Sequence, residues 1–481
     1  MHRRTKICLN GTSPIQAARA RRCSAGSRGA AYPDIMHNFA LVISFVLVMR
    51  MHRRGFIFSS TAALAGIGCT GRRPALSSGP PSVACRPDSS ADSSGMFESL
   101  HGFCDGIDPP SQAEYEAHVA RVQSRLRRLG LAAVVVEPGA SMTYLSGVRW
   151  RLSERPFLLV VLAAGDPVWV CPSFERATAR ERIGAQAEIA SWYEHQDPYE
   201  QAARVIGAGS GRVAMDPTAR LFVFAGLASA LGADRIAAID VVGDCRANKS
   251  DAELARLRRA NCATKAAIRA AAAMARPAMN QQEFAAKIAA AQGAAGLSDV
   301  WVLCLFGPNA AFPHGTGQER QLRSGDFILV DTGGSLHGYR SDITRTWPFG
   351  RVSSEARDVW EIVRRAQQAA MAKIAPGVPC SEPEAAARTV VEQAGYGPGY
   401  RYLTHRLGHG IGLQVHERPY LVRGNPRILQ PGMTMSNEPG IYIPGQLGVR
   451  IEDIVAVTAD GNEVFGPGVD SIDRPLGTGH S

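Results

Sequence analysis

The 481-residue sequence has little net charge outside its first 73 residues, although its formal charge is +10. Residues 1–73 hold 12 Lys and Arg against the single acid Asp34, so the rest of the chain carries 41 basic and 42 acidic residues. Proteins that bind a polyanion usually present a basic patch or stripe. The main part of the chain therefore gives no electrostatic reason to expect nucleic acid as a partner.

Long apolar runs and paired cysteines are also missing. The longest apolar run, Phe39–Met49, has 11 residues including one Ser, whereas a membrane-spanning helix needs about 20. None of the ten cysteines forms a C-x-x-C pair, which argues against a zinc ribbon or a thioredoxin-type redox pair. Disulfide bonds remain possible if the protein is exported. A hydrophobic share of 45% with 20% charged residues is ordinary globular composition.

An export signal is predicted near the N-terminus. Arg53 and Arg54 precede a short, weakly apolar stretch over residues 58–68, which is typical of a twin-arginine signal. Met51 offers an alternative start, and Cys69 is a candidate lipid-attachment site and the only predicted link to a membrane. The prediction places the protein in the periplasm or another extracytoplasmic location. If the arginine pair is instead a chance pair of an Arg-rich chain, the protein is cytoplasmic.

Residues 1–110 are interpreted as an extension outside the fold, because residues 70–110 are rich in Ser, Pro and Gly and resemble a flexible tether. A first domain is predicted over residues 111–246. Helical spacing over 111–129 is followed by strand-like runs at 131–136, 157–162, 167–171 and 236–242, with a helix near 174–183. This alternation indicates an α/β domain. It holds no convincing catalytic cluster, so we interpret it as a scaffold or specificity domain.

A second domain is predicted over residues 249–470. Three capping patterns, in which Ser or Asn is followed three positions later by Glu, indicate helix starts at Ser250, Asn280 and Ser381. A further helix is expected over residues 354–374. The expected strands cover residues 327–332, 341–347, 433–437 and 449–457. Segregated helices and strands favour an α+β domain with helices packed on an antiparallel sheet.

Four carboxylates and one imidazole mark this second domain as the site of chemistry. Asp331 and Asp342 lie on two expected strands joined by a short turn, so they are expected to face each other across a ladder. Such close carboxylates repel unless a proton or cation lies between them. Glu438 and Glu452 add two acids on strand-like segments, and His409 supplies the imidazole. Any one of these acids alone would be interpreted as a turn or strand-end residue paired with an arginine. The four acids together with the histidine favour a metal site.

This ligand set is rich in hard oxygen atoms, so it suits a pair of Mn²⁺, Co²⁺, Fe²⁺ or Zn²⁺ ions better than a tetrahedral structural zinc. Two ions about 3.5 to 4 Å apart can hold a hydroxide and polarise a carbonyl, which is the two-metal scheme of hydrolysis.

The stretch from about Lys249 to Phe465 resembles metallopeptidase family M24, the pita-bread fold, and within it the Xaa-Pro branch of prolidases and aminopeptidase P. Residues 111–246 resemble the creatinase-type domain that precedes it. The order and spacing of the five ligands carry the resemblance. It implies two metal ions per subunit, Mn²⁺ foremost, bridged by Asp342 and Glu452. Asp331 would complete one metal, and His409 with Glu438 the other.

The resemblance also implies roles for residues beside the metals. Glu438 would act as general base toward the bridging water. His314 and His416 match catalytic histidines, the latter near the substrate carbonyl or its oxyanion, and His405 matches one on the proline side of the pocket. Tyr442 and Arg450 match residues that orient the base or the substrate. Arg450 could instead neutralise a crowded anionic site, and each lone histidine could be structural.

The function that follows from the resemblance is hydrolysis of Xaa-Pro bonds by an exopeptidase, as a homodimer acting on small peptides with proline at the second position. Because the fold carries several chemistries, alternatives stay open. Creatinase lacks this ligand set. The dimethylsulfoniopropionate-lyase branch has an acid two positions after the first metal Asp, where this chain has Gly333. A hydrolase or lyase of a small amide or osmolyte, a binding protein without activity, and a methionine aminopeptidase are the other candidates.

Overall fold

A computed structural model of the protein describes Gly95 and residues 97–209 and 211–477. The predicted twin-arginine segment and Cys69 lie outside these described residues, so the export signal and the lipid attachment stay predictions. Across the described ranges, we find no helix whose length and hydropathy would let it cross a membrane.

The prediction of a tether up to residue 110 is wrong from residue 97 onward. Phe97, Leu100 and Cys104 are buried in one hydrophobic core with residues of the second domain. A 3₁₀ turn, η1 (Glu98–Leu100), begins the segment, and the Arg259 guanidinium donates to the Phe103 carbonyl. The sequence did not reveal this packing, because the few apolar residues of the segment follow a long stretch rich in Ser, Pro and Gly.

The first domain alternates helices and strands, as expected. Its elements are α2 (Gln112–Arg128), β1 (Leu131–Val136), α3 (Ala140–Ser146), β2 (Leu158–Leu162), β3 (Val168–Pro172), η2 (Ser173–Glu175), α4 (Arg176–Ile183), β4 (Glu188–Trp192), α5 (Pro198–Ile206), β5 (Arg212–Met215), α6 (Leu221–Leu231), η3 (Ala233–Arg235), β6 (Ile236–Ala237) and α7 (Val241–Ala247). The strands form one mixed sheet in the order β4-β3-β2-β1-β5-β6. Strand β1 is central because its apolar run is buried on both faces.

The strand expected over residues 236–242 is only partly correct. Strand β6 ends at Ala237, and helix α7 begins at Val241. Asp240 precedes α7, and its side chain accepts a hydrogen bond from the Gly243 amide. An aspartate at this position satisfies a free amide of the first helical turn, so the apolar residues after it continue as a helix.

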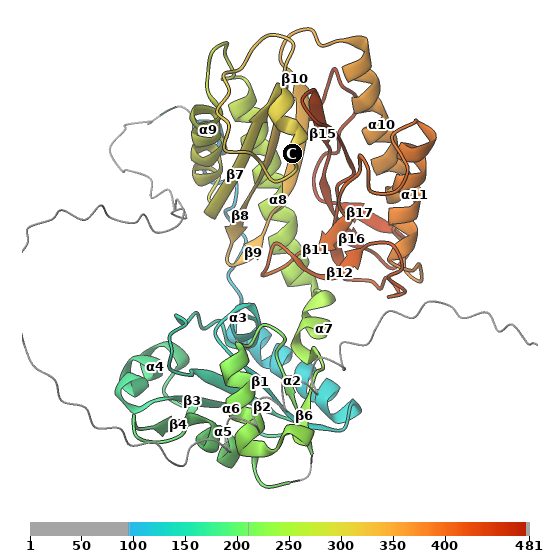
Figure 1. Ribbon diagram of the computed structural model, residues 1–481. Coiled ribbons are helices and arrows are strands. Elements are labelled where there is room, and N and C mark those ends of the chain that lie inside the picture. Colours follow the sequence, from blue (N-terminus) through green and yellow to red (C-terminus); the bar gives the residue numbers. More distant parts are fainter. Residues whose placement is uncertain (1–94, 96, 210, 478–481) are drawn as a thin grey trace, which may run out of the picture. The chain divides into compact units, whose positions relative to one another are not determined.

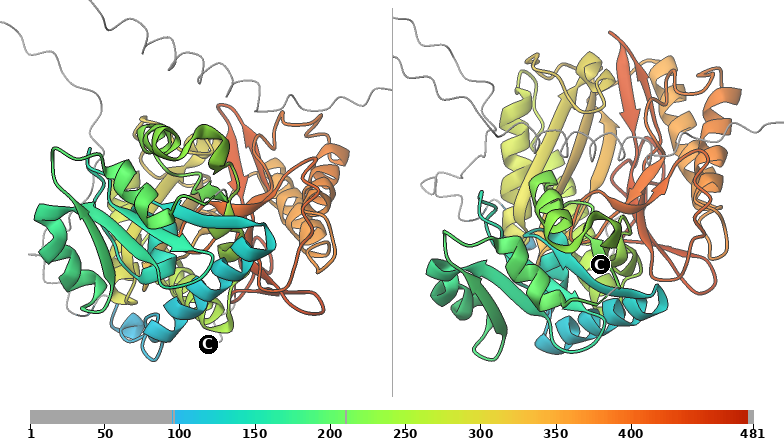
Figure 2. Two further views of the ribbon diagram at one scale, coloured as in Figure 1. Left: turned by 90° about the horizontal axis from the view of Figure 1, so that it is seen from below. Right: turned by 60° about the horizontal axis from the view of Figure 1, so that its bottom comes forward.

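In the second domain, two pairs of helices flank a set of antiparallel strands. Its elements are α8 (Asp251–Ala272), α9 (Gln281–Ala294), β7 (Ser298–Phe306), η4 (Gly307–Ala311), β8 (Phe327–Leu336), β9 (Tyr339–Arg340), β10 (Ile343–Pro348), α10 (Ser354–Met371), α11 (Ser381–Gln393), β11 (Gly408–Gly410), β12 (Glu417–Leu421), β13 (Thr434–Asn437), β14 (Gly440–Ile443), β15 (Leu447–Arg450), β16 (Asp453–Val457) and β17 (Asn462–Val464). Strands β10-β8-β7 form one sheet and β12-β11-β13-β16-β17 another. Figures 1 and 2 show α8 and α9 on one side of the strands and α10 and α11 on the other.

An α/β domain is thus followed by an α+β domain with helices packed on antiparallel strands, as the sequence predicts. Each half has its own core. Phe284 of α9 and Val330 of β8 belong to one core, and Trp360 of α10 and Val455 of β16 belong to the other. The capping patterns at Ser250 and Asn280 form capping boxes. The third pattern does not, because α11 already begins at Ser381.

The strand expected over residues 449–457 is interrupted. Strand β15 ends at Arg450 and pairs with β14, whereas β16 begins at Asp453 and pairs with β13. Ile451 and Glu452 lie between the two strands. The change of partner sheet therefore occurs at the position of a predicted metal ligand.

Candidate metal centre and active site

All five predicted metal ligands line one cavity of about 520 Å³. Asp331 lies within β8, Asp342 precedes β10, and His409 lies in the short strand β11. Glu438 follows β13, and Glu452 lies between β15 and β16. Strands from both halves of the domain, and the positions directly beside their ends, thus supply the ligands.

The sequence predicted that Asp331 and Asp342 face each other directly across the ladder, and this prediction is wrong. In the ladder of β8 and β10, Asp331 pairs with Thr344 and Thr332 pairs with Ile343. Asp342 stands two residues before Thr344, so it lies on the same face as Asp331 in a diagonal position. The turn is formed by His337 and Gly338, and β9 continues the ladder of β10 in the same register. Asp331 lies six residues before this turn and Asp342 only four residues after it, so the two cannot be directly opposite.

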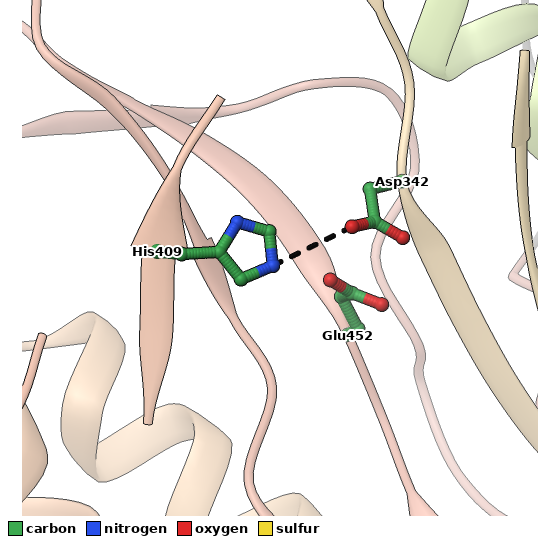
Figure 3. Close-up of side chains that lie close together, drawn as sticks. All are labelled: Asp342, His409 and Glu452. Carbon is green, nitrogen blue, oxygen red and sulfur yellow. Dashed lines mark ion pairs between the residues drawn. The ribbon is translucent and has the colours of Figure 1, made fainter. Parts of the chain in front are cut away.

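Three of the ligands converge closely. One ligand atom each of Asp342, His409 and Glu452 lies within 4.8 Å of the other two, and Figure 3 shows the three side chains pointing toward one another. The His409 Nε2 atom lies 3.5 Å from Asp342 Oδ2 and 3.2 Å from Glu438 Oε1. Its Nδ1 atom donates to the Gly410 carbonyl at 3.1 Å. That hydrogen bond leaves the Nε2 lone pair free to bind a metal ion.

The electrostatics of the site call for a cation. Burial raises the pKa of Asp342 well above its usual value, and the neighbouring carboxylates of Glu452, Asp331 and Glu438 raise it further. The pKa of Glu452 is also well raised, by burial first and then by Glu438 and Asp331. Carboxylates in this state need either protons or bound cations.

Two of the ligand oxygens, Asp331 Oδ1 and Glu452 Oε1, are buried and have no hydrogen-bond partner among the described residues. The other oxygen of each carboxylate is held by the protein. Asp331 Oδ2 accepts from Arg450 at 2.6 Å, and Glu452 Oε2 accepts from Thr344 at 2.8 Å. Each carboxylate is thus oriented by one oxygen and offers the other as a ligand. The residues present therefore fit divalent cations bound mainly through oxygen.

Arg450 is tied into the anionic site. Besides its ion pair with Asp331, its guanidinium donates to the Tyr442 hydroxyl at 2.8 Å and to Thr344 Oγ1 at 3.0 Å. The Tyr442 hydroxyl in turn lies 2.8 Å from His405 Nε2. The neutralising role that the sequence left open for Arg450 agrees with this geometry. His405 lines the cavity, whereas Tyr442 lies behind Arg450 and does not.

His314 and His416 line the same cavity, and neither side chain has a hydrogen-bond partner among the described residues. His416 is exposed, and its imidazole lies 4.1 Å from that of His409, measured between ring centroids. Desolvation by the cavity wall and the charge of His409 lower the pKa of His416 to about 4. A neutral imidazole there can donate a hydrogen bond to a substrate oxygen.

The cavity wall contains four residues that the sequence did not reveal, namely Trp301, Leu303, Pro313 and Arg406. Trp301 and Leu303 belong to β7, a strand that we did not predict although the continuous apolar run over residues 300–306 is consistent with a buried strand. Leu303 is paired with Asp331 in the ladder of β7 and β8, so Trp301 and Leu303 add an apolar wall beside the acids. Arg406 follows directly after His405, and its guanidinium lies 4.4 Å from the ring centre of Tyr420.

Comparison with known proteins gives matches over both domains. Residues 255–459 match the model of metallopeptidase family M24, and residues 118–247 match that of the creatinase/prolidase N-terminal domain. The probable dipeptidase PepE of Mycobacterium tuberculosis is 39% identical over 351 residues, which cover 72% of this chain and 93% of that protein.

Solved structures agree with these matches. The dipeptidase PepE from Mycobacterium ulcerans is 37% identical with a TM-score of 0.71, covering 75% of this chain and 97% of that one. The Xaa-Pro dipeptidase from Bacillus anthracis is 26% identical with a TM-score of 0.65, covering 74% of this chain and 98% of that one.

Proposed function

Because the chain belongs to metallopeptidase family M24, we propose that it is a metal-dependent exopeptidase that hydrolyses Xaa-Pro bonds in small peptides. The observation that carries the proposal is the convergence of four carboxylates and one imidazole on a single cavity. Its volume of about 520 Å³ suits a ligand of the size of a short peptide. The preference for proline is supported by the names of similar proteins, among them an Xaa-Pro dipeptidase.

Two divalent metal ions would be held by Asp331, Asp342, His409, Glu438 and Glu452. We propose Mn²⁺, because four of the five ligands are carboxylates. When bound, the ions would activate a water molecule and polarise the scissile carbonyl.

Side chains of the protein would then accept the proton of the water molecule and bind the substrate. Burial raises the pKa of Glu438, but before metal binds a protonated His409 and the guanidinium of Arg450 outweigh burial and lower the pKa. Bound cations would favour the ionised carboxylate in the same way. Glu438 is therefore ionised and able to accept a proton from the attacking water. The neutral His416 imidazole would donate a hydrogen bond to the oxygen that gains charge, and His314 would border the substrate.

A substrate panel tests the proposed function. We expect the purified full-length protein supplied with Mn²⁺ to cleave Ala-Pro or Ala-Pro-Ala and to leave Ala-Ala-Ala intact. The ratio of dipeptide to tripeptide cleavage separates a dipeptidase from an aminopeptidase. Cleavage of Ala-Ala-Ala at an equal rate would refute the proline preference. Failure to cleave any peptide despite bound metal would favour a small-molecule hydrolase or a binding protein.

The lyase alternative meets a steric obstacle at Gly333. A Cβ atom added there would lie 1.9 Å from the Ser341 carbonyl oxygen, which belongs to the backbone. The acid that the lyase branch carries at this position therefore has no room against the backbone of this chain. Inclusion of dimethylsulfoniopropionate in the panel tests the point, and we expect no turnover of it.

The same contact predicts that Gly333→Ala lowers stability. Relief of the clash must shift backbone in two strands, and such overpacking costs about 1 to 3 kcal/mol, so the melting temperature should fall by several degrees. Gly317→Ala is the matched control, because an added Cβ there meets nothing within 4 Å. Thermal denaturation of both variants checks the prediction, and equal melting temperatures would contradict it.

A further inference from the structure

A buried ion cluster joins the end of the first domain to the loop that carries His416. Glu417 accepts a hydrogen bond from Lys249 Nζ at 2.8 Å and another from the guanidinium of Arg246. Only 7% of the Glu417 side chain and 1% of the Lys249 side chain are exposed. Burial raises the pKa of Glu417, but Lys249 and Arg246 outweigh burial and lower the pKa, so this carboxylate is ionised at neutral pH.

The cluster is built from both domains. Arg246 lies in α7, the last helix of the first domain, and Lys249 follows it in the linker to α8. The linker is itself anchored, because the Lys249 amide donates to the Gly432 carbonyl at 2.8 Å. Glu417 is the first residue of β12 and directly follows His416. The side chains of Arg246 and Lys249 therefore contact the second domain at Glu417, directly after His416 of the active site.

Arg246 holds the loop on both sides of His416. The same guanidinium nitrogen that contacts Glu417 also donates to the Gln414 side-chain carbonyl at 2.8 Å. The loop is compact here, since the Gly412 amide donates to the Gln414 backbone carbonyl at 3.0 Å and a Cβ on Gly412 would lie 2.5 Å from Glu417 Oε1. His416 has no side-chain hydrogen bond of its own among the described residues. The backbone on either side of it therefore determines where its imidazole lies.

We propose that Arg246, Lys249 and Glu417 form a positioning site that holds His416 over the metal centre, and that the first domain thereby sets the geometry of the active site. The inference rests on the proposed function, in which His416 touches the substrate. A buried carboxylate between two cations suits this role, because an ionic cluster with good hydrogen bonds has few alternative arrangements.

Arg246→Gln is the variant of choice. Glu417→Gln would leave two buried cations without a partner, and a broken buried pair often costs enough stability to unfold a domain. Arg246→Gln keeps the Lys249–Glu417 pair and removes only the contacts to Glu417 and Gln414 that come from α7. A displacement of about 1 Å at a reacting group can cost 10²-fold in rate. We expect kcat on the best substrate to fall about 10- to 100-fold, with KM changed less than about 3-fold and metal content unchanged.

Arg427→Gln is the matched control. Arg427 donates to Asp244 Oδ1 at 2.9 Å and so also ties the catalytic domain to α7. Asp244 keeps its second partner, Arg125, in this variant. The control loses an ion pair between the domains without touching the loop around His416, so its kcat should equal that of the wild type. A similar loss of kcat in both variants would show a general effect of domain contact and would overturn the proposal.

A double-mutant cycle separates positioning from general damage. If Arg246 acts through His416, Arg246→Gln should cause no further loss of kcat in a His416→Ala background. Additive losses would overturn the proposal.

Amide hydrogen exchange provides a readout that does not depend on activity. Residues 411–418 should exchange faster in Arg246→Gln than in Arg427→Gln, with equal metal content in both. Unchanged exchange there would overturn the positioning inference whatever the substrate is. Faster exchange in a protein that cleaves no Xaa-Pro peptide would instead show that the proposed function fails while the loop is still held by Arg246.

Discussion

Replacement of Asp342 by Asn is expected to abolish peptide hydrolysis and to remove at least one metal ion per subunit. Asp342 shares a 4.8 Å cluster with His409 and Glu452, and we propose that it bridges both ions. An amide lacks the charge of the carboxylate, so the bridge is lost. A bound metal supplies several kcal/mol of transition-state stabilisation, and about 1.4 kcal/mol is a tenfold change in rate. Turnover should therefore fall by ~10³-fold or more. Metal analysis and hydrolysis of Ala-Pro measure both effects.

The same replacement is expected to stabilise the metal-free protein. Burial and three neighbouring carboxylates raise the pKa of Asp342 well above its usual value, so the ionised form opposes folding at neutral pH. For an acid whose pKa is raised by folding, this cost is present above the folded pKa and disappears as the pH falls. Metal-free Asp342→Asn should melt at a higher temperature than metal-free wild type at pH 8. The difference should shrink toward pH 4.

The control for both effects is Asp460→Asn, because Asp460 is exposed in the turn between β16 and β17 and does not line the cavity. It should behave as the wild type in hydrolysis, metal content and melting. Mn²⁺ should raise the melting temperature of the wild type and of this control, and Asp342→Asn should respond weakly. Full turnover by Asp342→Asn, with two ions bound, would refute the bridging assignment.

The ligands themselves were within reach of sequence reasoning, because each is a chemically distinctive residue in a short local motif. Asp331 and His409 are recognisable from their immediate neighbours, and the five residues occur in a fixed order. Their assembly on one cavity was predicted from the chemistry of the whole set, because so many close carboxylates favour a shared cation.

The exact register was out of reach, because it depends on how two strands pair. The turn at His337 and Gly338 lies six residues from Asp331 but four from Asp342, which places Asp342 in a diagonal position relative to Asp331. The break at Ile451 and Glu452 was hidden for a related reason. Residues 449–457 read as one apolar run, and only the two partner strands, β14 and β13, reveal that the run belongs to two sheets.

Contacts between distant segments carry no local signal at all. Arg246 and Glu417 are 171 residues apart and belong to different domains. In the sequence, Glu417 is only an acid beside a histidine, and Arg246 is one arginine in an Arg-rich chain. Their relation depends on how α7 packs against the loop before β12, which no periodicity encodes.

Replacement of His416 by Ala is expected to lower turnover by ~10² to 10³-fold while both metal ions stay bound. His416 lines the cavity and its ring lies against that of His409, but it has no hydrogen-bond partner among the described residues, so its removal breaks no hydrogen bond to a ligand. The loss corresponds to one transition-state hydrogen-bond donor. Steady-state kinetics on Ala-Pro, with metal analysis of the same sample, measures it. His195→Ala, at an exposed histidine of the first domain, should leave turnover unchanged.

His416→Gln distinguishes what the imidazole contributes. A glutamine side chain can donate a hydrogen bond through its amide, but it cannot take up and release a proton near neutral pH. If His416 stabilises the oxyanion as a donor, Gln should recover part of the activity that Ala loses. If it transfers protons, Gln and Ala should be equally poor. Unchanged turnover in His416→Ala would remove His416 from the active site altogether, and the cluster of Arg246, Lys249 and Glu417 would then hold a loop without a catalytic residue.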